Sequence, residues 1–210
     1  MQVVEYPRWV RGRLGGHTVI DSKRAKLLYL DGRKLPVYGF PEEDVRLDAI
    51  PADTITRHDD LVQVDFGALD EWLEEEERQV GHPPDVFHRI DVRQTSRHVR
   101  VSIRGRVVAE THRARALFET GLPVRWYIPR EDVLADLEPS QHRTVCAYKG
   151  HATHFDVAGE GAVAWSYPDP LHDGEPIRDL IAFYDERVDI EVDGELRERP
   201  ATQWSAGRSG

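Results

Sequence analysis

The sequence predicts a mainly β protein made of two tandem units with short helices, the first unit being degenerate. Three observations lead to this fold class. Several short segments alternate apolar and polar residues, turn signals separate them, and a set of short motifs occurs twice in the same order. The chain has 210 residues, of which 40% are hydrophobic and 31% charged. That composition fits a globular protein with one large domain or two small ones.

The repeated motifs lie roughly 90 residues apart, and this spacing predicts two similar folds in succession. We expect a first repeat over residues 1–80, a second over 81–200, and a disordered tail over 201–210. Pro83-Pro84 marks the boundary, because two prolines cannot continue a helix or a central strand. The matching motifs are Arg11-Gly12-Arg13 with Arg104-Gly105-Arg106, residues 19–25 with 108–114, Leu35-Pro36-Val37 with Leu122-Pro123-Val124, and residues 41–45 with 129–133.

Alternation of apolar and polar residues predicts half-buried strands at 61–66, 99–103 and 188–192. A returning strand is predicted at 106–110, after a turn at Gly105. The segment 188–192 is followed by Asp193-Gly194, a dipeptide typical of hairpin turns.

Short helices are predicted at 22–29 and 111–119. Ser22 and Thr111 would cap them, because a hydroxyl can accept the first backbone N–H bonds of a helix. The acidic stretch 68–79 is predicted to be a helix or a linker.

Charge and composition exclude several classes of function. The formal net charge is −10, whereas a protein that binds duplex nucleic acid is usually basic. No apolar run approaches the roughly 18–20 residues of a membrane span, and the first residues do not resemble a secretory signal. The one cysteine, Cys146, permits no intramolecular disulfide and no four-cysteine zinc site. We expect a cytoplasmic protein without metal or cofactor, present as a monomer or weak homodimer.

The segment from Cys146 to Gly150 is the first candidate site. On a strand Cys146 and Lys149 would face opposite ways, unless Gly150 permits a turn that brings thiol and ammonium together. A nearby cation favours the nucleophilic thiolate. Lys149 is the only lysine after position 34, and a buried lysine can act as base or nucleophile. The alternatives are an inert buried cysteine and an exposed, solubilising lysine.

Two histidines come next in the sequence. On a strand His154 and Asp156 would share a face, which predicts an acid–base pair that works near neutral pH. The alternative is a solvated hairpin in which His151 and His154 are partly exposed. Because the spacing of His151 and His154 suits a helix better than a strand and a third ligand is lacking, we expect no metal here.

Aromatic residues form the third candidate site. Trp165 and Tyr167 lie on one face of a predicted strand, and together with Tyr127 they could wall a pocket for a flat or cationic ligand. The alternative is ordinary core packing.

The second repeat contains three specific motifs, at residues 127–133, 146–152 and 165–168. With these motifs, the second half of the chain resembles a bacterial and fungal family known as domain of unknown function 427. The resemblance implies a bacterial protein with a β-tent fold, in which sheets meet at an angle over a pocket, and it implies no established activity. The family sometimes carries a nucleotidyltransferase label, but the sequence has no Gly-rich phosphate loop or paired-carboxylate metal motif.

These observations favour the binding of a small organic ligand in a pocket of the second repeat. An enzymatic version would use Cys146 or Lys149 as nucleophile in acyl or nucleotidyl transfer. The alternative is a protein- or peptide-interaction module without catalysis. A closed pocket would favour the first hypothesis, and a flat, exposed aromatic patch the second. The predicted catalytic residues are Cys146, Lys149 and His154, and the predicted ligand-binding residues are Tyr127, Gly150, Trp165 and Tyr167.

Overall fold

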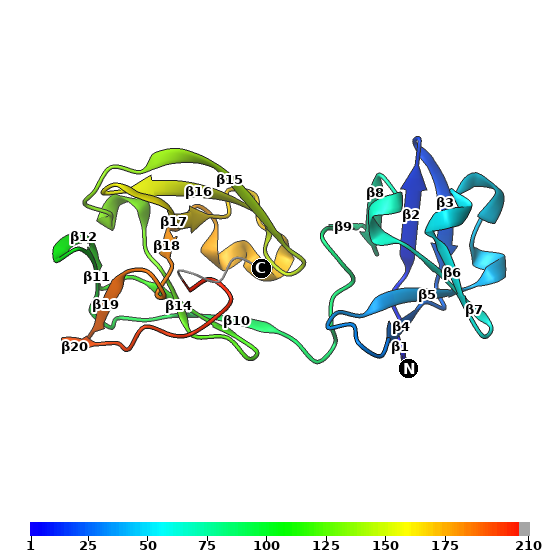
Figure 1. The fold of residues 1–210 in the computed structure, drawn as a ribbon, viewed down its shortest axis with the longest axis horizontal. Helices are drawn as coiled ribbons and strands as arrows, with labels where there is room; N and C mark the ends of the chain where they lie inside the picture. The colour runs from blue at the N-terminus through cyan, green and yellow to red at the C-terminus, as the bar shows by residue number, and fades with distance from the viewer. Residues whose placement is uncertain (206–210) are drawn as a thin grey trace. The chain divides into compact units, whose positions relative to one another are not determined.

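The computed structural model describes residues 1–205 (Figure 1). The protein is mainly β, with antiparallel sheets and only short 3-10 turns, as the sequence predicts. The chain divides into two compact units, Met1–Phe87 and the part that begins at His88. Within the described range, no helix has the length and apolar character that crossing a membrane would require.

The first unit contains two sheets. One has the order β1-β4-β5-β7-β6 and the other β3-β2-β8-β9. The strands are β1 (Gln2–Glu5), β2 (Val10–Leu14), β3 (His17–Ser22), β4 (Lys26–Tyr29), β5 (Val37–Pro41), β6 (Ile55–His58), β7 (Leu61–Val64), β8 (Glu71–Glu74) and β9 (Glu77–Gln79), and the 3-10 turns are η1 (Glu42–Asp44), η2 (Leu47–Ala49), η3 (Ala52–Thr54) and η4 (Phe66–Ala68).

The second unit contains three sheets, with the orders β10-β13-β14, β12-β11-β19-β20 and β15-β16-β17-β18. The strands are β10 (Ile90–Gln94), β11 (Val99–Ile103), β12 (Arg106–Thr111), β13 (Arg115–Glu119), β14 (Arg125–Tyr127), β15 (Glu138–Cys146), β16 (Gly150–Val157), β17 (Glu160–Ser166), β18 (Ala182–Phe183), β19 (Asp189–Val192) and β20 (Glu195–Leu196), and the 3-10 turns are η5 (Arg130–Asp132) and η6 (His172–Ile177). The predicted strands at 61–66, 99–103, 106–110 and 188–192 are confirmed as β7, β11, β12 and β19.

The same strand arrangement occurs in both units. The hairpin β2–β3 pairs with β8, just as β11–β12 pairs with β19. Strand β4 lies between β1 and β5, just as β13 lies between β10 and β14. Each hairpin shifts register in the same place, after Gly12 and after Val101. The bridge between Ile20 and Val45 has its counterpart between Ala109 and Val133.

A hydroxyl turns the chain at the end of β3 and of β12. Ser22 Oγ accepts the Arg24 N–H at 3.1 Å and donates to Asp44 Oδ2 at 2.7 Å. Thr111 Oγ1 accepts the Arg113 N–H at 2.9 Å and donates to Asp132 Oδ2 at 2.6 Å.

The helices predicted at 22–29 and 111–119 are therefore wrong. Both hydroxyls accept a backbone N–H, as expected for a helix cap, but they do so within a tight turn of the kind that Ser and Thr also stabilise. The chain then continues as β4 and β13, whose residues Leu27 and Leu117 are fully buried. Burial in a sheet decides the conformation here, because one local hydrogen bond serves both structures equally well.

The acidic stretch 68–79 is also not a helix. It forms the hairpin β8–β9, with Glu75 at positive φ in the turn. Trp72 of β8 is buried in the core. Glu74 is buried too, and its carboxylate accepts hydrogen bonds from Tyr6 Oη at 2.7 Å and from Tyr38 Oη. These partners make the buried charge tolerable, because a carboxylate removed from water needs hydrogen bonds.

The two units differ in the segment that follows the bridge present in both, Ile20–Val45 and Ala109–Val133. In the first unit the chain between Val45 and Leu61 forms two short turns and β6. In the second unit the chain between Val133 and Ile181 forms β15, β16, β17 and η6. This longer segment carries most of the predicted site residues.

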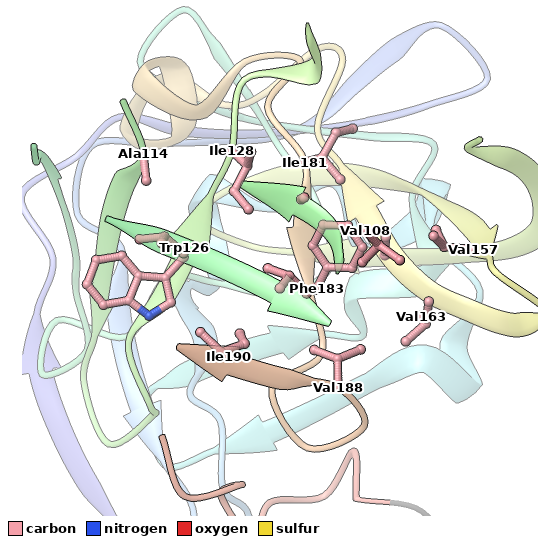
Figure 2. Packing of buried hydrophobic residues seen from close by; sticks show 14 of the residues in the cluster. Val108, Ala114, Trp126, Ile128, Val157, Val163, Ile181, Phe183, Val188 and Ile190 are labelled. Atoms are coloured by element: carbon pink, nitrogen blue, oxygen red, sulfur yellow. The ribbon is translucent and has the colours of Figure 1, made fainter. Parts of the chain in front are cut away.

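The core of the second unit includes residues of the strands that have counterparts in the first unit and residues of the additional sheet β15-β16-β17-β18. Figure 2 shows the side chains of Ile128, Ile181 and Phe183 in one cluster with Val163 of β17 and Ile190 of β19. Because this cluster includes residues of all three sheets, the added sheet is packed onto the shared framework.

The ends of the predicted repeats differ from those of the structure. The first unit continues past residue 80, where Tyr29 Oη donates to Asp85 at 2.7 Å and its ring packs on Phe87. The tail predicted to be disordered begins in an ordered segment, since Thr202 Oγ1 donates to Glu186. Residues 206–210 lie outside the described residues.

We predict that Thr111→Val lowers the free energy of unfolding by about 1–2 kcal/mol, because it leaves the Arg113 N–H and the Asp132 carboxylate without their shared partner. Denaturant unfolding at neutral pH measures the change. The matched control is Thr56→Val at an exposed position in β6, where we expect a change within about 0.5 kcal/mol. Equal effects of the two variants would contradict the role of the hydroxyl.

Candidate functional site

Three parts of the second unit supply the predicted site residues. Tyr127 ends β14, the hairpin β15–β16 carries Cys146, Lys149, Gly150 and His154, and β17 provides Trp165. Tyr167 comes directly after β17.

The turn expected at Gly150 is present. Cys146 is the last residue of β15 and pairs with Gly150, the first residue of β16. Gly150 has a φ of +93°, and a Cβ there would lie 3.3 Å from the backbone of Asp169 and of Leu171. A side chain at this position would be strained and crowded, so the tight turn requires glycine.

The turn buries Lys149 against a carboxylate. Lys149 is only 6% exposed, and its Nζ donates to Glu119 Oε2 at 2.6 Å. The other oxygen, Glu119 Oε1, contacts His88 Nε2 at 3.1 Å. The ammonium group is thus engaged by a carboxylate of β13, whereas the sequence suggested a partnership with the thiol of Cys146.

Glu119 and His88 were not identified from the sequence. They lie about 30 and 60 positions before Lys149, and no motif links the three residues. The only sequence signal near them was the internal repeat, which places β13 directly after the turn at Thr111.

The three aromatic residues of the predicted site pack together. Tyr127, Trp165 and Tyr167 belong to one buried cluster, and half-buried Cys146 packs against it. Trp165 Nε1 donates to Tyr127 Oη at 3.1 Å, and the two rings meet edge to face at 89°. The three rings are 7% exposed or less, so they do not form a flat exposed patch.

The two phenols of this cluster keep their protons at neutral pH. Burial raises the pKa of Tyr127 and of Tyr167 above the ordinary value, and the nearby groups of Glu119 and Cys146 raise the pKa of both further. Two hydroxyls, a thiol and a buried ion pair therefore act on one another in this part of the second unit. The arrangement offers protonated donors beside an aromatic wall.

His154 is placed differently from the sequence-based expectation. Its Nε2 hydrogen-bonds Thr144 Oγ1 at 2.9 Å, while Asp156 Oδ1 accepts the Ala162 N–H at 2.6 Å. The predicted His154–Asp156 pair is therefore wrong. Strand β16 shifts register between Phe155 and Val157 where it pairs with β17, and Asp156 serves the turn there.

Burial makes His154 a poor base for chemistry near neutral pH. The ring is 1% exposed, and Nδ1 has no hydrogen-bond partner among the described residues. Burial, with smaller contributions from His142 and Arg143, lowers the pKa of His154 to about 4. The imidazole is thus neutral at pH 7 and stacks on Tyr184 at a centroid distance of 6.2 Å.

Metal-ligating side chains do not cluster here. Among residues 1–205 no group of three or more His, Cys, Asp or Glu side chains is placed to hold a metal ion. His151 is exposed while His154 is buried, so the two do not face a common point.

We predict that the pH dependence of stability includes a contribution from His154. Between its ordinary pKa of 6.5 and the folded value of about 4, the unfolded chain binds a proton that the folded chain does not. Stability therefore falls as the pH falls through this window, by roughly 2–3 kcal/mol from this residue. His154→Phe should lose less stability between pH 7 and pH 4.5 than the wild type, as measured by denaturation midpoints. The control His151→Gln, at an exposed position of the same strand, should keep the wild-type loss; an unchanged loss in His154→Phe would contradict the assignment.

Comparison with known proteins supports the resemblance seen in the sequence. Residues 91–194 match the family described as Domain of unknown function (DUF427). Comparison with curated proteins finds no match. The matched segment runs from β10 to the turn after β19 and includes every predicted site residue. Through its second unit, the chain therefore belongs to the DUF427 family.

Proposed function

We propose that the second unit binds a small organic ligand beside the cluster of Tyr127, Cys146, Trp165 and Tyr167. The main observation in support of this proposal is the turn between β15 and β16. It seats Cys146 on the aromatic cluster and buries the Lys149–Glu119 ion pair close to the same phenols. Convergent polar groups beside an aromatic wall are typical of small-molecule sites.

The groups present favour a ligand with a flat apolar body and an oxygen acceptor. The hydroxyls of Tyr127 and Tyr167 are protonated and can donate to a carbonyl or carboxylate oxygen. Trp165 supplies an aromatic face and already donates its N–H to Tyr127. A ligand that accepts hydrogen bonds at one end and stacks at the other would use both features.

The first unit supports this proposal by what it lacks. Gly39 pairs with Lys26 in the first unit, and Tyr127 pairs with Arg115 in the corresponding strands of the second unit. Gly39 is therefore the counterpart of Tyr127. A Cβ on Gly39 would meet the side chain of Leu28 at 2.9 Å, so apolar packing occupies that position. We infer that the chain arose by tandem duplication, and that the second copy alone carries the phenol of this site.

Ligand binding is better supported than a catalytic role for Lys149. A lysine nucleophile must lose its proton, whereas Lys149 is held in an ion pair with Glu119. The interaction-module alternative has less support, because the aromatic rings are buried. A reducing cytoplasm remains part of the proposal, since the chain has one cysteine.

Native mass spectrometry of the full chain after incubation with a metabolite extract tests the proposal. We expect one retained small molecule. Tyr167→Phe should weaken its binding about two- to tenfold, the value of one neutral hydrogen bond. The control Tyr29→Phe removes a phenol hydroxyl from the first unit and should leave affinity unchanged. Retention of no molecule, or equal weakening by both variants, would count against the site.

The ion pair gives a second prediction. Lys149→Met leaves the Glu119 carboxylate buried without its ammonium partner and should cost about 3–5 kcal/mol of stability. The double variant Lys149→Met with Glu119→Leu should recover most of that loss in denaturant unfolding, because no unpaired charge remains.

The double variant also separates folding from binding. If the ion pair serves the ligand, the stable double variant should still bind the retained molecule more weakly than the wild type. Wild-type affinity in this variant would show that the ion pair is only structural.

A further inference from the structure

A cavity of about 320 Å³ lies in the first unit and is lined by residues of that unit alone. This volume is at the lower end of the range for small-molecule sites. The loop between β4 and β5 forms one side, and the end of β7 with the start of η4 forms another. The lining residues are Arg33, Lys34, Leu35, Pro36, Val37, Tyr38, Gln63, Val64, Asp65, Phe66, Gly81, His82 and Pro83.

The rim of the cavity carries two adjacent cations. Arg33 and Lys34 are exposed, and neither side chain makes an ion pair or hydrogen bond within residues 1–205. Two adjacent, unengaged cations at the mouth of a cavity favour an anionic ligand, and the planar fork of arginine matches a carboxylate. In the part of this unit that the structure describes, Arg46 and Arg78 also have no ion pair, whereas the other arginines pair with acids, namely Arg8, Arg11, Arg13, Arg24 and Arg57.

The wall of the cavity suits an aromatic ring. Tyr38 and Phe66 both line it, with ring centroids 6.4 Å apart and an angle of 29° between their planes. The hydroxyl of Tyr38 is committed to Glu74 and its ring is buried in the aromatic core, so half-buried Phe66 supplies the ring that a ligand would contact. Flat, apolar walls of this kind bind flat ligands by stacking and by exclusion of water.

Buried polar groups add specificity. Gln63 is 3% exposed, its Oε1 is bonded to His58 Nε2 at 2.8 Å, and its Nε2 donates to Asp65 Oδ1 at 3.3 Å. The second hydrogen on Nε2 has no acceptor among the described residues. The exposed carboxylate of Asp65 can accept a hydrogen bond from a ligand hydroxyl.

We propose that this cavity binds a hydroxylated aromatic carboxylate. The carboxylate would pair with Arg33 and Lys34, the ring would lie along Phe66, and the hydroxyl would reach the Gln63–Asp65 pair. The site is independent of the one proposed in the second unit, because all its residues belong to the first.

Titration of the full chain with 4-hydroxybenzoate, followed by amide chemical shifts, tests the proposal. We expect saturable shifts at residues 33–38 and 63–66. Because a charge-assisted hydrogen bond contributes roughly 1.5–3 kcal/mol, the double variant Arg33→Gln with Lys34→Gln should bind at least about tenfold more weakly. The neutral analogue 4-hydroxybenzamide should show a comparable loss against the wild type.

The control Arg46→Gln with Lys23→Gln removes the same number of positive charges from exposed positions of the first unit that do not line the cavity, and should leave affinity unchanged. Equal weakening by the control pair, equal binding of the amide, or no saturable shift at the cavity residues would overturn the proposal. Shifts confined to Tyr127, Trp165 and their neighbours would also overturn it, while leaving the site in the second unit in place.

Discussion

One hydroxyl with two hydrogen bonds sets the geometry of each unit. Ser22 and Thr111 each accept a backbone N–H and donate to a carboxylate, which turns the chain from a hairpin into the neighbouring sheet. Although burial alone would raise it, hydrogen bonds from Arg113 and Thr111 hold the pKa of Asp132 below its ordinary value. Asp132 therefore stays charged at neutral pH and keeps its hydrogen bond to Thr111. The turn at Thr111 in this way fixes the positions of β13 and β14, which carry Glu119 and Tyr127.

A fixed framework leaves the segment after the bridge present in both units free to vary. In the first unit that segment is short, and Leu28 fills the space next to Gly39. In the second unit it forms a sheet that packs on Tyr127 and places Lys149 against Glu119. Function can be gained or lost through this segment without disturbing the strands that pair in both units, as is usual for loops that extend from a stable scaffold.

Alternation identified strands such as β11 and β19 because it reports directly on which face of a strand is buried, but most other strands were not predicted from the sequence. It failed where one local signal serves two structures. The hydroxyls of Ser22 and Thr111 suit a helix cap and a tight turn alike, and only burial in a sheet decides between them. His154 and Asp156 were paired by assuming a regular strand, which the register shift near Phe155 breaks. Glu119 could not be found, because its contact with Lys149 joins two distant segments.

Buried Glu74 has a consequence for how a chain with two similar halves folds. It pairs with Val10 in β2–β8, at the position where Val192 pairs with Val99 in β11–β19. Proteins with similar tandem domains are prone to misassembly, in which a strand of one copy inserts into the other. If β8 took the place of β19, its carboxylate would be buried in an apolar site without Tyr6 or Tyr38, which is costly. The hydrogen-bonded site of Glu74 in the first unit therefore favours β8 in its own sheet over the position of β19.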